Sequence, residues 1–173
     1  NVLRECIKNI PREKYFVSTK VGRYTVNNFD FSYNGIINSV NESLKRLNLN
    51  YLDLVQCHDI EFCVSLDIIL NETLPALKKL QDENKIRYIG ITGLQLDKLD
   101  YIITNSIINI DTVLVYCTYN LFNTTLDNYS QKWKQFGITI IQGGVTSMGL
   151  LTNQGPKDWH PASKKIKETC KET

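Results

Sequence analysis

The stretch YLDLVQCHD, residues 51–59, decides the fold class, because a nearly continuous apolar run ends directly in polar residues that can carry chemistry. Runs of this kind are typical of strands buried on both faces, as they are in a parallel sheet. Similar runs, rich in β-branched and aromatic residues, recur along the chain. They predict strands at Tyr15–Ser18, Tyr51–Cys57, Arg87–Ile91, Thr112–Tyr116 and Ile138–Ile141.

Amphipathic stretches with helical spacing separate the predicted strands. We expect three of these helices to begin at the N-cap residues Ser32, Ser65 and Asp127. The strand starts lie roughly 25 to 37 residues apart, which is the span of a βα unit with a right-handed crossover. The alternation therefore predicts an α/β fold with a parallel sheet of about five consecutive βα units. The predicted helices are Tyr33–Leu47, Leu66–Leu80, Leu96–Ile103 and Leu126–Phe136.

Two architectures fit this alternation: a complete doubly wound domain and a contiguous part of a (β/α)8 TIM barrel. A whole barrel needs about 250 residues, and the chain has 173. A doubly wound nucleotide-binding domain carries a glycine-rich phosphate loop, but the segment STKVGR at 18–23 is not one, and no GxGxxG or GxxxxGK[ST] follows a later strand. We therefore favour the partial barrel and keep a flavodoxin-like module as the weaker alternative.

Composition excludes several classes of partner. With 20 Lys and Arg against 18 Asp and Glu, the net charge is +2. Because no run of five like charges occurs, we expect no binding of nucleic acid. The apolar runs fall far short of the roughly 18 to 20 residues of a membrane span. The five cysteines form no CxxC pair, which favours reduced thiols in the cytoplasm. Because the chain starts at Asn1 and not at a methionine, we expect it to be part of a longer protein.

Polar residues collect where the predicted strands end, and in a barrel these ends meet at the rim that holds the active site. A lysine such as Lys20 can depress the pKa of a neighbouring acid, and a neutral His58 can donate to a carbonyl oxygen. A solvated lysine and a structural histidine remain the alternatives at this point. Cys57 and His58 lie on opposite faces of a strand, so we expect no metal site there.

Several phrases of the sequence resemble the aldo/keto reductase family, and within it a branch of sugar dehydrogenases. The resemblance covers essentially the whole chain, and phrases such as HDIEF and GPKDWHPAS are specific to that branch. The phrases are YFVSTKVGRY at 15–24, FDFSYNGIINSVNESLKRLNLNYLDLVQCHDIEF at 29–62, NETLPALKKLQDENKIRYIGITGLQLD at 71–97, VLVYCTYN at 113–120 and MGLLTNQGPKDWHPAS at 148–163.

This resemblance implies a (β/α)8 barrel that binds NAD or NADP and moves a hydride between nicotinamide and a carbonyl or alcohol carbon. Residues 1–173 are then the central part of a single domain that lacks its N-terminal and C-terminal βα units. Lys20 and His58 match the lysine and histidine of the catalytic Asp-Tyr-Lys-His tetrad, whose other two members fall upstream of Asn1. The residues implied to bind the cofactor are Thr92, Gly93, Tyr116, Gly143, Gly144, Ser147, Gly149 and Leu150.

The resemblance also implies a reaction. The full-length parent is expected to oxidise the C1 hydroxyl of an aldose such as L-galactose to a lactone with NAD(P)+, so that its partner is a small sugar or carbonyl substrate. The chain alone is expected to be inactive, because it lacks the tetrad tyrosine. The alternative is a catalytically inactive fragment of the same family that serves as a binding or structural subunit.

Overall fold

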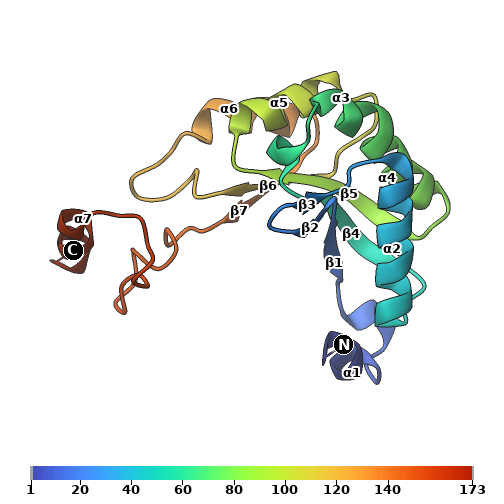
Figure 1. Ribbon diagram of the computed structural model, residues 1–173, viewed down its shortest axis with the longest axis horizontal. Helices are drawn as coiled ribbons and strands as arrows, with labels where there is room; N and C mark the ends of the chain where they lie inside the picture. Colours follow the sequence, from blue (N-terminus) through green and yellow to red (C-terminus); the bar gives the residue numbers. More distant parts are fainter. Residues whose placement is uncertain (1, 173) are drawn as a thin grey trace.

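The computed structural model describes residues 2–172 and is built around one five-stranded sheet (Figure 1). Its strands are β1 Ser18–Val21, β4 Leu52–Cys57, β5 Ile86–Gly93, β6 Thr112–Tyr116 and β7 Thr139–Gly143. They lie side by side in this order, and every neighbouring pair is parallel. A doubly wound sheet reverses its strand order at a switch point, whereas consecutive barrel strands follow the chain. The predicted partial (β/α)8 barrel is therefore confirmed.

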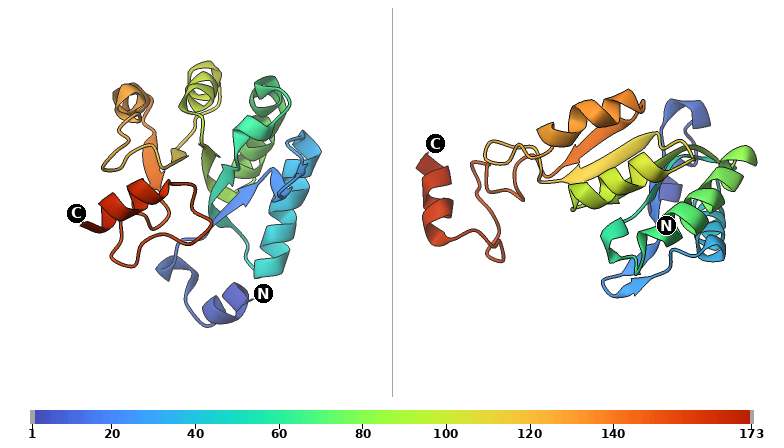
Figure 2. Two further views of the ribbon diagram at one scale, coloured as in Figure 1. Left: turned by 60° about the vertical axis from the view of Figure 1, so that its left-hand side comes forward. Right: turned by 90° about the horizontal axis from the view of Figure 1, so that it is seen from above.

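Helices cover one face of the sheet as an arc (Figure 2, left): α2 Tyr33–Leu47, α4 Leu74–Asp82, α5 Leu96–Asn105 and α6 Asp127–Gln135. Strand side chains on the covered face, such as Val55, Ile89 and Val113, are 0% exposed and form the core. The opposite face is more open, with Tyr88 46% and Tyr116 38% exposed. In a closed barrel this second face is the packed interior.

Shorter elements connect these βα units. The chain begins with α1 Val2–Ile7 and η1 Arg12–Lys14; the hairpin of β2 Arg23–Thr25 and β3 Asn28–Phe29 follows β1, and η2 Ile60–Phe62 follows β4. After β7 the chain runs away from the sheet and ends in α7 Lys164–Glu172 (Figure 1). Within residues 2–172, no helix combines the length and hydropathy of a membrane-spanning segment.

The first strand begins at Ser18 and not at Tyr15, where the apolar run predicted it. Just upstream of it, the Val17 N–H donates to the Asp53 carboxylate at 2.7 Å. The partner of this N–H lies far along the chain, so the local pattern of apolar residues could not reveal it. As a result Lys20, which we expected to follow the strand, lies within it.

The predicted helix Leu66–Leu80 is interrupted. A short helix, α3, spans Leu66–Ile68; a π-helical turn, η3, spans Ile69–Thr73; and only then does α4 begin. Pro75 accounts for the irregularity, because it has no N–H to donate to a carbonyl in the preceding turn. The apolar periodicity runs through the break, which is why it predicted one continuous helix.

Two of the three predicted helix caps are confirmed. The Ser32 hydroxyl accepts the Gly35 N–H at 3.2 Å, and the Ser65 hydroxyl accepts the Asp67 N–H at 3.2 Å. The prediction for Asp127 is wrong, because this residue is the first of α6 and not its cap.

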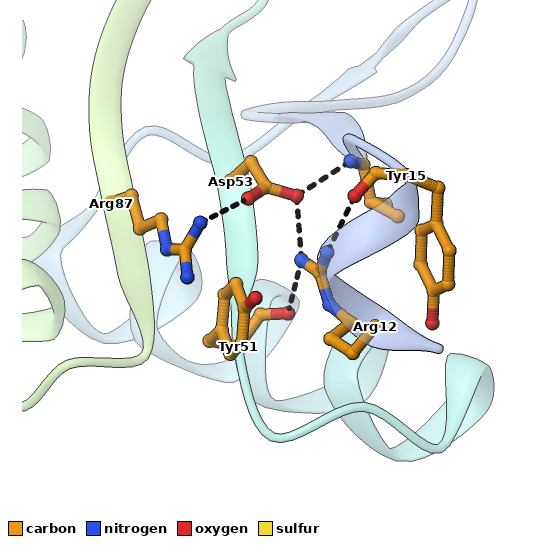
Figure 3. Close-up of polar contacts among 6 residues, drawn as sticks. Arg12, Tyr15, Tyr51, Asp53 and Arg87 are labelled. Carbon is orange, nitrogen blue, oxygen red and sulfur yellow. Dashed lines mark hydrogen bonds and ion pairs between the residues drawn. The ribbon is translucent and has the colours of Figure 1, made fainter. Parts of the chain in front are cut away.

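A charge cluster around the buried Asp53 carboxylate lies at the amino ends of the strands (Figure 3). The Asp53 side chain is 2% exposed and pairs with Arg12 at 2.6 Å and with Arg87 at 3.1 Å. Both guanidinium groups also lie over the Tyr51 ring, at 3.9 and 4.1 Å from its centroid. Residues at this end of a barrel usually stabilise the fold and do not take part in catalysis. We therefore infer that the cluster contributes to stability.

Candidate active site

A cleft of about 470 Å³ opens where the carboxyl ends of the strands meet. Six of the ten residues that the sequence singled out line it, and they come from all five strands of the sheet or from the residues directly after them. Asp59, Leu94 and Leu114 complete the lining. The six are Lys20, His58, Thr92, Gly93, Tyr116 and Gly143.

Strand register explains why Lys20 and His58 face the same cleft. Lys20 on β1 lies opposite Gln56 on β4, and side chains at matching positions of neighbouring parallel strands point to the same face. His58 follows Gln56 by two residues and keeps that orientation. The His58 N–H then donates to the Val21 carbonyl at 2.9 Å, which extends the pairing of the two strands past the end of β4.

The His58 imidazole is held largely neutral. Its side chain is 31% exposed, and its pKa is lowered chiefly by burial; the nearby positive charges of Lys20 and Arg23 lower it further, and only Asp59 opposes them. A neutral imidazole keeps one nitrogen as a donor and the other as an acceptor. His58 can therefore donate a hydrogen bond to a substrate oxygen at physiological pH.

Asp59 is a site residue that the sequence analysis did not single out. It adopts a left-handed backbone conformation, with φ of 54°, and its carboxylate pairs with Arg23 and lies 3.5 Å from the His58 Nε2. The Asp59 N–H donates to the Thr92 hydroxyl at 2.9 Å. Its place directly after His58, at the end of a strand, was the available signal.

The Glu61 side chain packs on Gly93. A Cβ atom at this position would lie 2.7 Å from the Glu61 Oε2, and the other carboxylate oxygen of Glu61 accepts the Leu94 N–H at 2.8 Å. Glu61 therefore lies across the end of β5, and a side chain at residue 93 would have to displace its carboxylate. The backbone after Thr92 is fixed in this way, and with it one wall of the cleft.

On the far side of the cleft, β6 packs closely on the glycine pair after β7. A Cβ on Gly144 would lie 2.5 Å from the Cys117 Sγ and 3.1 Å from the Tyr116 ring, and a Cβ on Gly143 would also lie 3.1 Å from that ring. The Cys117 N–H donates to the Gly143 carbonyl at 2.9 Å. A side chain at either glycine would therefore press on the Tyr116 ring, and one at Gly144 would also clash with Cys117.

The remaining predicted residues lie outside this cleft. Ser147 and Leu150 line a second, largely apolar cavity of about 770 Å³ beside α7, and neither Gly144 nor Gly149 lines either space. Ser147 is 6% exposed, and its buried hydroxyl has no hydrogen-bond partner among the described residues. Of the ten residues, six therefore line the cleft, two line the second cavity, and Gly144 and Gly149 line neither.

His160 holds the segment around Ser147 in place. Its Nδ1 accepts the Ala162 N–H at 3.1 Å, so its Nε2 carries the proton and donates to the Ser147 carbonyl at 3.0 Å. His160 is 7% exposed, and the sequence analysis did not include it among the site residues. The sequence around His160 does not reveal this contact, because the Ser147 carbonyl lies 13 residues earlier in the chain.

Comparison with known proteins gives a consistent result. The model of the "Aldo/keto reductase family" matches residues 1–173. L-galactose dehydrogenase of Arabidopsis thaliana is 47% identical over 163 residues, covering 94% of this chain and 50% of that protein. D-arabinose 1-dehydrogenase of Saccharomyces cerevisiae is 34% identical over 166 residues, covering 91% of this chain and 49% of that protein. The chain thus spans about half the length of these curated relatives.

Solved structures show the same likeness. The aldo-keto reductase AKR11C1 from Bacillus halodurans, in its holo form, superimposes with a TM-score of 0.73 at 25% identity, covering 91% of this chain and 49% of that chain. The glycerol dehydrogenase AKR11B4 from Gluconobacter oxydans superimposes with a TM-score of 0.70 at 23% identity, covering 95% of this chain and 50% of that chain. The second likeness concerns the fold alone.

Proposed function

The chain belongs to the aldo/keto reductase family, and from this premise we propose that the complete protein is an NAD(P)-dependent dehydrogenase that oxidises the C1 hydroxyl of an aldose such as L-galactose to a lactone. One observation carries the proposal: Lys20 and His58 line a single cleft at the carboxyl ends of neighbouring strands. The choice of an aldose rests on the two sugar dehydrogenases that resemble the chain over most of its length.

We further propose that residues 1–173 are the central part of one barrel domain. The matched relatives are about twice as long, and within the described part of the chain β1 and β7 each have a strand partner on one side only. Barrel units before β1 and after β7 would pair with these edges and enclose the open face of the sheet. We place the protein in the cytoplasm, because its five cysteines are free thiols.

The residues present fit a dinucleotide cofactor. Thr92, Gly93 and Tyr116 would hold its nicotinamide end beside the cleft. The segment after β7 would hold its phosphates, because the buried Ser147 hydroxyl has no partner among residues 2–172. In addition, three consecutive residues from Ser147 to Gly149 have positive φ, a backbone form that suits close approach to an anion. When bound, the cofactor supplies the acceptor for the hydride that leaves C1.

The chain's own residues act on the oxygen of the substrate. Neutral His58 donates a hydrogen bond to the C1 oxygen and orients it in the cleft. The ammonium group of Lys20 favours negative charge on the group beside it that takes up the hydroxyl proton. By resemblance, that group is a tyrosine supplied by the barrel unit upstream of this chain.

Turnover by the complete protein tests the proposal. Reduced nicotinamide is followed by its absorbance with NAD+ and NADP+ across a panel of aldoses that includes L-galactose. Lys20→Met and His58→Gln are each expected to lower kcat by roughly 10²- to 10⁴-fold, the usual loss of a positioned acid–base group. Lys45→Met, which removes an exposed lysine of α2, is the matched control and should keep full activity. No turnover with any aldose would favour the inactive subunit instead.

A further inference from the structure

The Asp59 carboxylate links three separate strands at the rim of the cleft. One oxygen, Oδ2, pairs with Arg23 from β2 and lies 3.5 Å from the Nε2 of His58, which follows β4. The other oxygen, Oδ1, accepts the hydroxyl proton of Thr92 on β5 at 3.4 Å. The Asp59 side chain is only 18% exposed, so these contacts are partly shielded from water.

Asp59 has little freedom to leave this position. Its N–H donates to the Thr92 hydroxyl at 2.9 Å, and its left-handed backbone costs free energy for a residue other than glycine. On the other side, the Arg23 guanidinium lies 5.5 Å from the centroid of the Phe29 ring and 5.2 Å from that of Phe62. A strained residue held from both sides is an arrangement that occurs at functional sites.

We infer that Asp59 is a positioning residue for His58: its carboxylate keeps the imidazole proton on Nε2 and holds the ring at the cleft, while Arg23 holds the carboxylate. The reason is electrostatic, because a carboxylate oxygen 3.5 Å from Nε2 favours the tautomer that carries a proton on that nitrogen. The catalytic consequence rests on the proposed function and takes the Nε2 proton as the one that His58 donates to the substrate oxygen. The 3.5 Å separation between Nε2 and the Asp59 carboxylate is longer than a normal hydrogen bond, so this proton stays available to the substrate.

The charged groups around His58 predict how its pKa changes when each of them is removed. They are Lys20 on β1, Arg23 on β2 and Asp59 itself. Of these, only Asp59 raises the pKa of His58, and Arg23 lowers it. Asp59→Asn should therefore lower the His58 pKa further below its ordinary value, whereas Arg23→Met should raise it. Loosening of the site would instead return the pKa toward the ordinary value in both variants, because burial is the main cause of its lowering.

The experiment is a ¹⁵N and ¹³C NMR titration of histidine in the complete protein, with His58→Gln used to assign the signals. Wild type should show the Nε2–H tautomer at His58, and Asp59→Asn should show an increased Nδ1–H fraction. The two variants should shift the His58 titration in opposite directions. Asp82→Asn, which removes an exposed carboxylate of α4, is the matched control and should leave the tautomer and the titration unchanged.

Kinetics provide the second measurement. Asp59→Asn should lower kcat by about tenfold or more, a part of the ~10²- to 10⁴-fold that an acid–base group supplies, and should change KM little. A rise in KM alone, a tautomer that does not depend on Asp59, or shifts of the titration in the same direction in both variants would overturn the inference. The NMR result does not require turnover, so failure of the proposed function and failure of this inference can be told apart.

Discussion

At the scale of single residues, the chemistry of the cleft depends on which neighbours each side chain has. The sequence identified Lys20 and His58 because both lie at the carboxyl ends of apolar strands. The sequence showed Asp59 at the end of a strand but gave no reason to choose it, because an aspartate there is common and only the fold brings Arg23 and Thr92 to it. His160 was not chosen as a site residue for a similar reason, since its partner is a backbone carbonyl.

The glycine after β7 provides a prediction at this scale. Gly144→Ala should destabilise the fold by about 1–2 kcal/mol for the positive φ of 71°, with about 1–3 kcal/mol more for crowding against Cys117. Gly137→Ala is the matched control, because its φ is 75° but, among the described residues beyond its two chain neighbours, no other residue has an atom within 4 Å of the added Cβ. Urea unfolding of the complete protein gives both free energies.

One more variant distinguishes the two causes of the loss of stability in Gly144→Ala, which are crowding against Cys117 and backbone strain. Cys117→Ala shortens the side chain that would meet the new Cβ, so it should recover much of the difference between the two glycine variants. Equal losses at Gly144 and Gly137 would mean that the close approach of β6 to this glycine is not as described.

At the scale of elements, apolar patterning located every strand of the main sheet, but its details failed where a distant side chain or a proline intervened. The strand β1 begins three residues later than predicted, because the Val17 N–H donates to the Asp53 carboxylate. The helix after Ser65 was divided at a π turn near Pro75. The β2–β3 hairpin, which brings Arg23 to the site, carried no recognisable turn signal.

The charge cluster at the amino ends of the strands gives a prediction about these elements. Asp53→Asn should destabilise the protein by about 1–3 kcal/mol, because the largely buried Arg12 guanidinium loses its carboxylate partner, whereas the half-exposed Arg87 guanidinium stays hydrated. The same change at exposed Asp82 should alter stability by less than about 0.5 kcal/mol. Thermal unfolding monitored by circular dichroism measures both.

This cluster lies at the end of the strands opposite the cleft, so its effect on catalysis should be small. At a temperature where Asp53→Asn remains folded, its kcat should match that of wild type. A kcat reduced as strongly as in Lys20→Met would contradict the assignment of the two ends of the sheet to stability and to chemistry.

At the scale of the whole molecule, the alternation of strands and helices predicted the partial barrel, and strand order confirmed it. The sequence did not predict that some of the expected cofactor residues line the cleft and others line the cavity beside α7. Their placement depends on the path of the chain after β7. There the backbone leaves the sheet through several residues with positive φ, a change of direction that no apolar pattern records.

The 173-residue chain by itself should be inactive and prone to association. It lacks the tyrosine that, by resemblance, takes up the hydroxyl proton, and it exposes both sheet edges together with aromatic side chains such as Tyr88. Size-exclusion chromatography should show oligomers, and no reduced nicotinamide should form with L-galactose. A stable, active monomer would show that these residues form a complete enzyme.

The most direct test of the central claim is the transfer of hydrogen from C1. The complete protein is incubated with an aldose deuterated at C1, and the reduced cofactor is analysed by mass spectrometry. We predict one deuterium in the nicotinamide ring, formed at a rate that falls roughly 10²- to 10⁴-fold in both Lys20→Met and His58→Gln. A reduced cofactor without deuterium, or deuterium transfer that neither substitution slows, would contradict the assignment of this cleft as the active site of an aldose dehydrogenase.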